Sequence, residues 1–276
     1  MKIWAAWLQG RSVAPEFVQK NLSLWEALHP NDTFHVVEQA ECDRIIRDLG
    51  ITNPRLTPQV QTDIVRTWLL ATEGGVWVDS TLLPTQRLQD WLTDDLMAQG
   101  FFAFRSLGDP NLVLQNWFLA SAPRNPLATN WLDNYIDYLR QNRIYPTWKR
   151  ALWHRKWLQY QSYRRAMRSR DTLWTVEPGR GRDCPFIPYA AHNYNFALAL
   201  KQNAELAAVW DKVPCRSAHI PQLLATLASD PETMDISLHS ALPELLALAP
   251  VHKLNHRDPR FTRFAETVAE QFSFRI

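Results

Sequence analysis

The order of apolar and polar positions in the first half of the chain predicts strands that alternate with helices. Short apolar runs at 2–8 and 33–37 are typical of buried strands. Between them, residues 15–28 begin with a proline and repeat apolar residues at helical spacing. A second short helix is expected at 41–50, which ends in a glycine. This β-α-β-α order is typical of an α/β protein whose mainly parallel sheet is flanked by helices.

A helix with clear ends leads directly into a third expected strand. Residues 58–73 begin with a proline, keep one apolar stripe and stop at Gly74 and Gly75. The apolar run 76–78 follows and ends at Asp79. Because ligands of such sheets gather beyond the carboxyl ends of the strands, we expect Asp79 to lie at a binding site.

The rest of the chain changes in character from mixed to helical. Further elements are expected as strands at 101–106, 113–121 and 250–257 and as an amphipathic helix at 125–142. We find no internal repeat and no low-complexity linker. We therefore expect a single domain, 1–276, with an insertion at 143–185 and a mostly helical C-terminal part at 186–276.

Composition and cysteine usage narrow the class of protein. The chain has 276 residues, of which 46% are apolar and 21% charged, as in ordinary globular proteins. Its three cysteines are far apart and form no CxxC pair, which argues against a disulfide framework and a thiolate zinc site. Polar residues follow the first apolar run closely, and no apolar run reaches about 18 residues. We expect a cytoplasmic protein with no leader peptide and no spanning helix.

One segment carries most of the positive charge. Residues 143–182 contain eleven Lys or Arg side chains against two acidic ones, and 148–170 also contains several Trp and Tyr. The simplest interpretation is a solvated helix face with aromatic rings packed beneath it. Two functional interpretations remain beside it, namely docking on an anionic membrane and binding of nucleic acid by stacking and phosphate contacts.

Asp63 and Arg66 are three residues apart on the expected helix and therefore share one face. A surface ion pair is the simplest interpretation of such spacing. However, this helix feeds directly into the strand that ends at Asp79, so all three side chains can point at one pocket. A carboxylate after a buried strand commonly holds a divalent cation or a ribose hydroxyl.

The segment DIVRTWLLATEGGVWVDST resembles the D-x-x-R, L-x-x-x-G-G, D-x-D signature of glycosyltransferases of the family 32 type. Its GGVWVDST version is similar to the capsular polysaccharide synthesis branch. The opening IWAAWLQG and the segment LQNWFLASAPRNPL at 114–127 resemble further parts of that branch. The resemblance implies a GT-A-like fold, a nucleotide-sugar donor, a divalent metal and retention of anomeric configuration. The sequence contains no GxSxG, HExxH or GxxxxGK[ST] motif, so the resemblance meets no competing motif.

The resemblance assigns roles to individual residues. It implies that Asp79, Asp63 and Arg66 are the catalytic residues, with Asp63 and Arg66 on the donor sugar and Asp79 facing the ribose and the metal. The other donor-binding residues that we expect are Trp7 (stacked on the nucleobase), Gln9, Asn116 (near the sugar) and Lys253 (on the diphosphate).

The sequence departs from the common signature at Thr81, which stands where the second aspartate is usual. A Mn²⁺ or Mg²⁺ ion would then be held by Asp79 and by a late histidine. His256 is the expected ligand, and His252 is a second candidate. The metal itself is an expectation from the resemblance.

The function that follows is a hexosyltransferase type of glycosyltransferase in polysaccharide synthesis, which uses residues 1–142 to bind a nucleotide sugar, expected to be a UDP-sugar. The acceptor would be a glycan or a lipid-linked glycan. Contact of 148–170 with an anionic membrane fits this function, and we expect no nucleic-acid partner. Two alternatives stay open, a non-catalytic nucleotide-sugar binder and a basic membrane-surface or nucleic-acid-binding protein.

Overall fold

We describe the protein from a computed structural model. The residues that it describes are 1–106, 108, 110–141, 143–144, 149, 156–229, 237–258 and 260–274, without the side chains of 237–240.

The described part of the chain is built on a five-stranded sheet with the order β2-β1-β3-β6-β5. Its strands are β1 (Lys2–Ala6), β2 (Thr33–Val37), β3 (Gly75–Val78), β5 (Phe101–Arg105) and β6 (Leu114–Ser121). β1 pairs in parallel with both β2 and β3, whereas β6 runs antiparallel to β3 and to β5. Four strands therefore point one way and β6 points the other way. The predicted α/β class with a mainly parallel sheet is confirmed.

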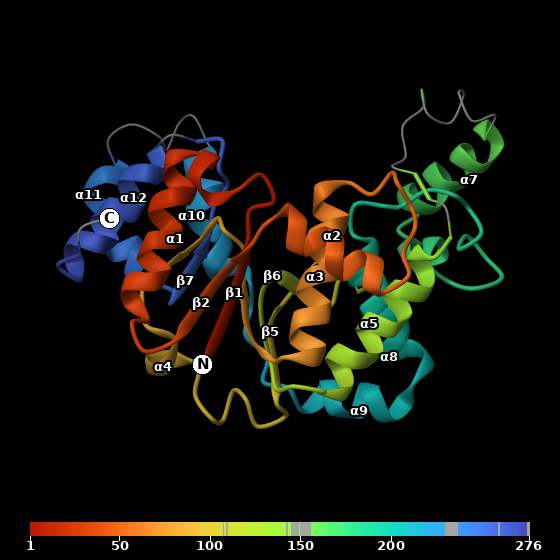
Figure 1. Cartoon of the computed structure of the whole chain (residues 1–276), viewed down its shortest axis with the longest axis horizontal. Coiled ribbons are helices and arrows are strands. Elements are labelled where there is room, and N and C mark those ends of the chain that lie inside the picture. Colours follow the sequence, from red (N-terminus) through yellow and green to blue (C-terminus); the bar gives the residue numbers. More distant parts are fainter. Residues whose placement is uncertain are drawn as a thin grey trace.

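Helices cover both faces of this sheet (Figure 1). The helices of the described part are α1 (Glu16–Leu28), α2 (Gln39–Asp48), α3 (Pro58–Thr72), α4 (Leu88–Trp91), α5 (Pro126–Leu139), α7 (Trp157–Arg168), α8 (Ala191–Gln202), α9 (Ala204–Lys212), α10 (His219–Ser229), α11 (Ser237–Ala247) and α12 (Arg260–Gln271), of which α7 lies away from the sheet. One apolar core joins the sheet to α2, α3, α5, α8 and α9. A second core joins the opposite face to α1, α10, α11 and α12. None of the helices in the described part is both apolar and long enough to cross a bilayer.

The link from α3 to β3 explains the paired glycines. Thr57 caps the start of α3 by accepting the N–H of Val60, and Gly74 donates its N–H to Leu69 at the end. Gly74 and Gly75 both have positive φ angles, 66° and 99°. A Cβ on Gly75 would lie 2.4 Å from a main-chain oxygen of β1. Glycine is therefore required here both to turn the chain and to let the two strands pair.

A second sheet of two strands lies beside the end of β3, and only one of its strands was expected. The predicted strand at 250–257 is confirmed for β7 (Val251–Lys253), but β4 (Leu82–Pro84) was not expected because it is only three residues long. The two strands pair antiparallel, with Leu82 opposite Lys253. This pairing brings a residue from the last tenth of the chain next to the segment after Asp79.

The helical C-terminal part is confirmed. Two separate helices, α8 and α9, occupy the first part of this region, because Asn203 ends the first and its side chain caps the second. In the basic segment 148–170, α7 and its flanking residues are described, whereas 148 and 150–155 lie outside the described residues.

Candidate functional site

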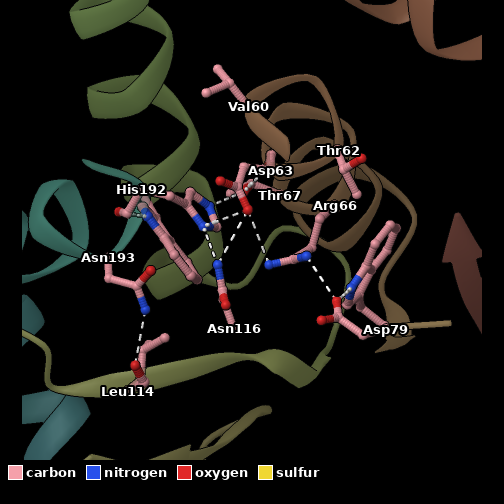
Figure 2. A network of polar contacts seen from close by, with 12 residues as sticks. Val60, Thr62, Asp63, Arg66, Thr67, Asp79, Leu114, Asn116, His192 and Asn193 are labelled. Carbon is pink, nitrogen blue, oxygen red and sulfur yellow. Dashed lines mark hydrogen bonds and ion pairs between the residues drawn. The ribbon is translucent and has the colours of Figure 1, made fainter. Parts of the chain in front are cut away.

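A chain of ionic contacts joins α3 to the end of β3. The Nη1 atom of Arg66 lies 3.1 Å from Oδ1 of Asp63, and Nη2 donates to Oδ1 of Asp79 at 2.9 Å. The same Asp79 oxygen accepts the indole N–H of Trp77 at 3.1 Å. Figure 2 shows Arg66 between the two carboxylates. The structure brings these three residues together, as expected. The interpretation of Asp63 and Arg66 as a surface ion pair is wrong, because the Arg66 side chain is only 6% exposed.

Lys253 completes the ionic chain from the other side. Its Nζ lies 3.1 Å from Oδ2 of Asp79 and donates to the Thr81 hydroxyl at 2.6 Å. The β4–β7 pairing fixes this approach, because Leu254 also donates its N–H to the Thr81 carbonyl at 3.0 Å. Asp79 is thus held by two cations, one on each oxygen.

Asn116 lies on the Asp63 side of the site. It begins the part of β6 that runs beside the carboxyl end of β3, where Asp79 donates its N–H to the Trp117 carbonyl. The Asn116 amide donates to Oδ1 of Asp63 at 3.2 Å and contacts Nδ1 of His192, also at 3.2 Å. The structure therefore brings Asn116 to the predicted acid and adds a histidine that the sequence did not single out.

The His192 ring is held in one neutral form (Figure 2). The Thr67 hydroxyl donates to the Asp63 carbonyl at 2.7 Å, so it accepts from Nε2–H of His192, at 2.6 Å. Nδ1 is then free to accept the Asn116 amide. Trp131 stacks on the ring with centroids 4.0 Å apart and donates its N–H to the His192 carbonyl. His192 thus orients Asn116, and through it Asp63.

Sequence reasoning missed these supporting residues for different reasons. Thr67 is four residues after Asp63, and this helical spacing was a usable signal. His192 starts a helix far along the chain, and no motif or spacing marked it. Only the packing of α8 on α5 brings it to the site.

The two carboxyl groups differ in their electrostatic state. Burial raises the pKa of Asp63 to about 7, although Arg66 opposes the rise. Burial also acts to raise the pKa of Asp79, but Lys253 and Arg66 outweigh it and hold this pKa below its ordinary value. Burial, with Arg66, lowers the pKa of His192 well below its usual range. Near pH 7 the site therefore contains an ionised Asp79 and a neutral His192, and the Asp63 carboxyl titrates close to this pH.

The remaining predicted residues lie at different distances from this cluster. Trp7 follows β1 and is half-buried, and its ring meets the exposed His256 edge to face, with centroids 5.6 Å apart. Gln9 is exposed in the turn after β1. His252 points away from Lys253, as neighbours on a strand do, and its ring nitrogen contacts the Leu246 carbonyl. Their roles in donor or metal binding stay predictions.

A pocket of about 300 Å³ opens beside Asp63. Its lining is polar at the start of α3 and apolar where the chain approaches α8, and the residues are Thr57, Gln59, Val60, Asp63, Ile187, Pro188 and Tyr189. A larger hollow of about 390 Å³ between α2 and the 51–56 segment contains none of the predicted site residues. The smaller pocket therefore adjoins the site through Asp63.

The residues present do not fit a resident divalent cation. Mg²⁺ takes six ligands in octahedral geometry, usually one or two carboxylates together with water and substrate phosphates. Here both oxygens of Asp79 face positively charged side chains, and the Thr81 hydroxyl faces Lys253. Across the described residues, no three His, Cys, Asp or Glu side chains lie close enough together to hold a metal.

Comparison with known proteins places the chain in a family. The family model of the capsular polysaccharide synthesis protein matches residues 1–148, which is more than half of the 276 residues. The chain therefore belongs to the capsular polysaccharide synthesis protein family. The matched part contains Asp63, Arg66, Asp79 and Asn116.

Other comparisons add little. One solved structure similar to this chain is the PaToxG glycosyltransferase, with 11% identity over 91% of this chain and 88% of that chain. Its TM-score of 0.36 is too low to define a common fold, so no assignment rests on it. A search of curated proteins found no match.

Proposed function

We propose that this protein is a glycosyltransferase that moves a sugar from a nucleotide-sugar donor to a glycan or lipid-linked acceptor in capsular polysaccharide synthesis. The observation that supports this most is the order of contacts in the site. Side-chain contacts link Asn116 to Asp63, Asp63 to Arg66, Arg66 to Asp79 and Asp79 to Lys253. Groups that bind hydroxyls therefore stand beside groups that bind phosphate, in the order of the parts of a nucleotide sugar.

The chemistry of transfer needs this combination. Cleavage of the anomeric C–O bond leaves negative charge on the diphosphate and positive charge on the sugar ring, so charge stabilisation and orientation matter most. Arg66 and Lys253 supply positive charge for the diphosphate. Asp63 and Asn116 supply acceptors and a donor for sugar hydroxyls, and the pocket beside Asp63 offers room for the ring.

We further propose a GT-A-like arrangement, a hexosyl group carried on UDP, stacking of Trp7 on the base and retention of configuration. An inverting transfer needs a carboxylate base on the acceptor hydroxyl. Both carboxylates of the cluster, Asp63 and Asp79, already face Arg66. Retention of configuration is proposed from the resemblance to family 32 glycosyltransferases, and the anomeric configuration of the product, read by NMR, tests it.

Stabilisation of the folded protein by donors tests the proposed function. At about 100 times its dissociation constant a ligand adds close to 2.7 kcal/mol of stability, which is a clear rise in Tm. We expect one nucleotide sugar, a UDP-, GDP- or ADP-sugar, to raise Tm. Asn116→Ala should weaken binding of that nucleotide sugar by about tenfold, since a sugar hydroxyl loses its partner. The same variant should leave binding of the sugar-free nucleoside diphosphate nearly unchanged.

The alternatives give different results in this experiment. A non-catalytic binder would show the same rise in Tm but would neither hydrolyse nor transfer the donor sugar. A membrane-surface or nucleic-acid-binding protein would show no rise with any nucleotide sugar, and its binding of nucleic acid would fall steeply with salt.

We also propose a cytoplasmic location with peripheral contact to an anionic membrane through 148–170, where a lipid-linked acceptor would be met. In the described part, α7 exposes Trp157 (41%) and Leu158 (81%) and carries exposed arginines. Each cation near such a surface contributes roughly 1 kcal/mol. The triple change Trp157→Ser, Arg165→Ser and Arg168→Ser should therefore weaken co-sedimentation with phosphatidylglycerol vesicles at least tenfold.

The matched control removes two exposed arginines elsewhere, Arg44 and Arg47 of α2. Its binding to the same vesicles should change less than twofold. If both variants lose vesicle binding equally, the net charge of the protein explains the binding, and α7 is not the docking element.

A further inference from the structure

Two oxygen-bearing side chains after β3 converge on one point, and an ammonium group fills it. Oδ2 of Asp79 and the hydroxyl of Thr81 lie 3.1 and 2.6 Å from Nζ of Lys253. A cation bound between positions 79 and 81 would need the same two oxygens. In this protein Lys253 supplies that positive charge from within the chain.

The fold fixes the ammonium in this position. Leu82 and Lys253 are opposite each other in the β4–β7 ladder, and the Leu254 N–H bonds the Thr81 carbonyl. The main chain under Lys253 is therefore tied on both sides of its side chain. Among the described residues, the further hydrogen bond of the ammonium is a long 3.4 Å contact to the Leu254 carbonyl. The Lys253 side chain is 24% exposed, so a ligand can reach part of it.

A divalent cation would have to displace this arrangement. The other oxygen of Asp79 is occupied by Arg66 and Trp77, and the Asp63 carboxylate lies beyond Arg66. An ion that entered between Asp79 and Thr81 would meet two like charges within a few ångströms. Like charges at such distances repel strongly in a partly buried site.

We propose that Lys253 takes the place of the divalent cation and that, together with Arg66, it neutralises the donor diphosphate, so that transfer needs no metal. This inference rests on the proposed function. The anomeric C–O bond breaks and its electron pair goes to the diphosphate oxygen, which leaves as the nucleoside diphosphate. The acceptor hydroxyl oxygen forms the new C–O bond and gives its proton to water. Lys253 transfers no proton and acts by charge alone.

Binding of free UDP, measured by calorimetry in EDTA and again with Mn²⁺, tests this inference; GDP and ADP serve if UDP is not the nucleotide. We expect the wild-type protein to bind with affinities within about threefold in the two conditions, and donor turnover to show the same insensitivity. Lys253→Met should lose at least tenfold in affinity in EDTA, whereas Lys253→Arg, which keeps the charge, should stay within about threefold. Circular dichroism of both variants shows that the fold is retained.

A double variant tests the inference by a gain, namely Mn²⁺-dependent binding of UDP, instead of by a loss of binding. Lys253→Met with Thr81→Asp replaces the ammonium with a second carboxylate and should bind UDP only when Mn²⁺ is present. If the wild-type protein binds UDP and turns over donor only with Mn²⁺, this inference is overturned and the proposed function stands. If no nucleoside diphosphate or nucleotide sugar binds in either condition, the proposed function falls, and this inference falls with it.

Discussion

Replacing Arg66 with Met should lower the free energy of unfolding by about 1–2 kcal/mol at pH 8, because it breaks a buried ionic pair and the Asp63 carboxyl, left without a counter-charge, must take up a proton. Arg66 is almost fully buried, and it is the cation that contacts Asp63 in the described site. Asp79 keeps Lys253, so the loss comes mainly from Asp63. Urea denaturation at constant ionic strength measures it.

The loss should depend on pH in a defined direction. The pKa of Asp63 in the folded protein, about 7, lies above its value in the unfolded chain, about 4. The folded state therefore holds this proton more tightly, and the Asp63 contribution to stability falls as pH rises from about 4 to about 7. Without Arg66 the carboxyl can escape its charge only by protonation. The destabilisation of Arg66→Met should thus be smaller at pH 5.5 than at pH 8.

The double variant Asp63→Asn with Arg66→Met is the control, because asparagine has nearly the same shape as aspartate but no charge. At pH 8 it should recover most of the stability lost in Arg66→Met, and its pH dependence between 5.5 and 8 should be weaker. Equal losses in the single and double variants would show that packing of the arginine, and not the charge of Asp63, sets the effect.

Asp79→Asn should reduce kcat for sugar transfer at least 100-fold while the protein stays folded. The amide oxygen can still accept from Arg66 and Trp77, so the core of the site is preserved. The amide cannot hold Lys253 as a carboxylate does, and the ammonium loses its fixed position. Because the site becomes more positive, affinity for the free nucleoside diphosphate should stay within about tenfold. Steady-state kinetics and calorimetry separate these two effects.

The matched change Asp90→Asn removes a charge from an exposed residue of α4 and should leave kcat unchanged. Full activity of Asp79→Asn would exclude Asp79 from catalysis. Loss of UDP binding together with loss of fold would instead give Asp79 a purely structural role.

The ionic contacts among Asp63, Arg66 and Asp79 were predictable because these residues are close in sequence. Asp63, Arg66 and Asp79 lie on one helix and at the end of the strand that follows it, and the glycine pair fixes the turn between them. Helical spacing and the strand-end rule were therefore sufficient. Asn116 followed from the resemblance to a known family, and the structure brings it to Asp63.

The rest depends on contacts between distant segments, which no local pattern records. Lys253 was expected on the diphosphate, but its place between Asp79 and Thr81 follows from pairing with β4, a strand too short to show a period. His192 reaches Asn116 only because α8 packs on α5. The antiparallel direction of β6 in the sheet could not be predicted either, since an apolar run does not show which way a strand points.

We propose above all that the cluster from Asn116 to Lys253 binds a nucleotide sugar. A crystal structure with the donor identified by the Tm panel tests it most directly. We expect the diphosphate within hydrogen-bonding distance of Lys253 and Arg66, and the sugar against Asp63 and Asn116. A donor bound in another part of the protein, with this cluster empty, would contradict it.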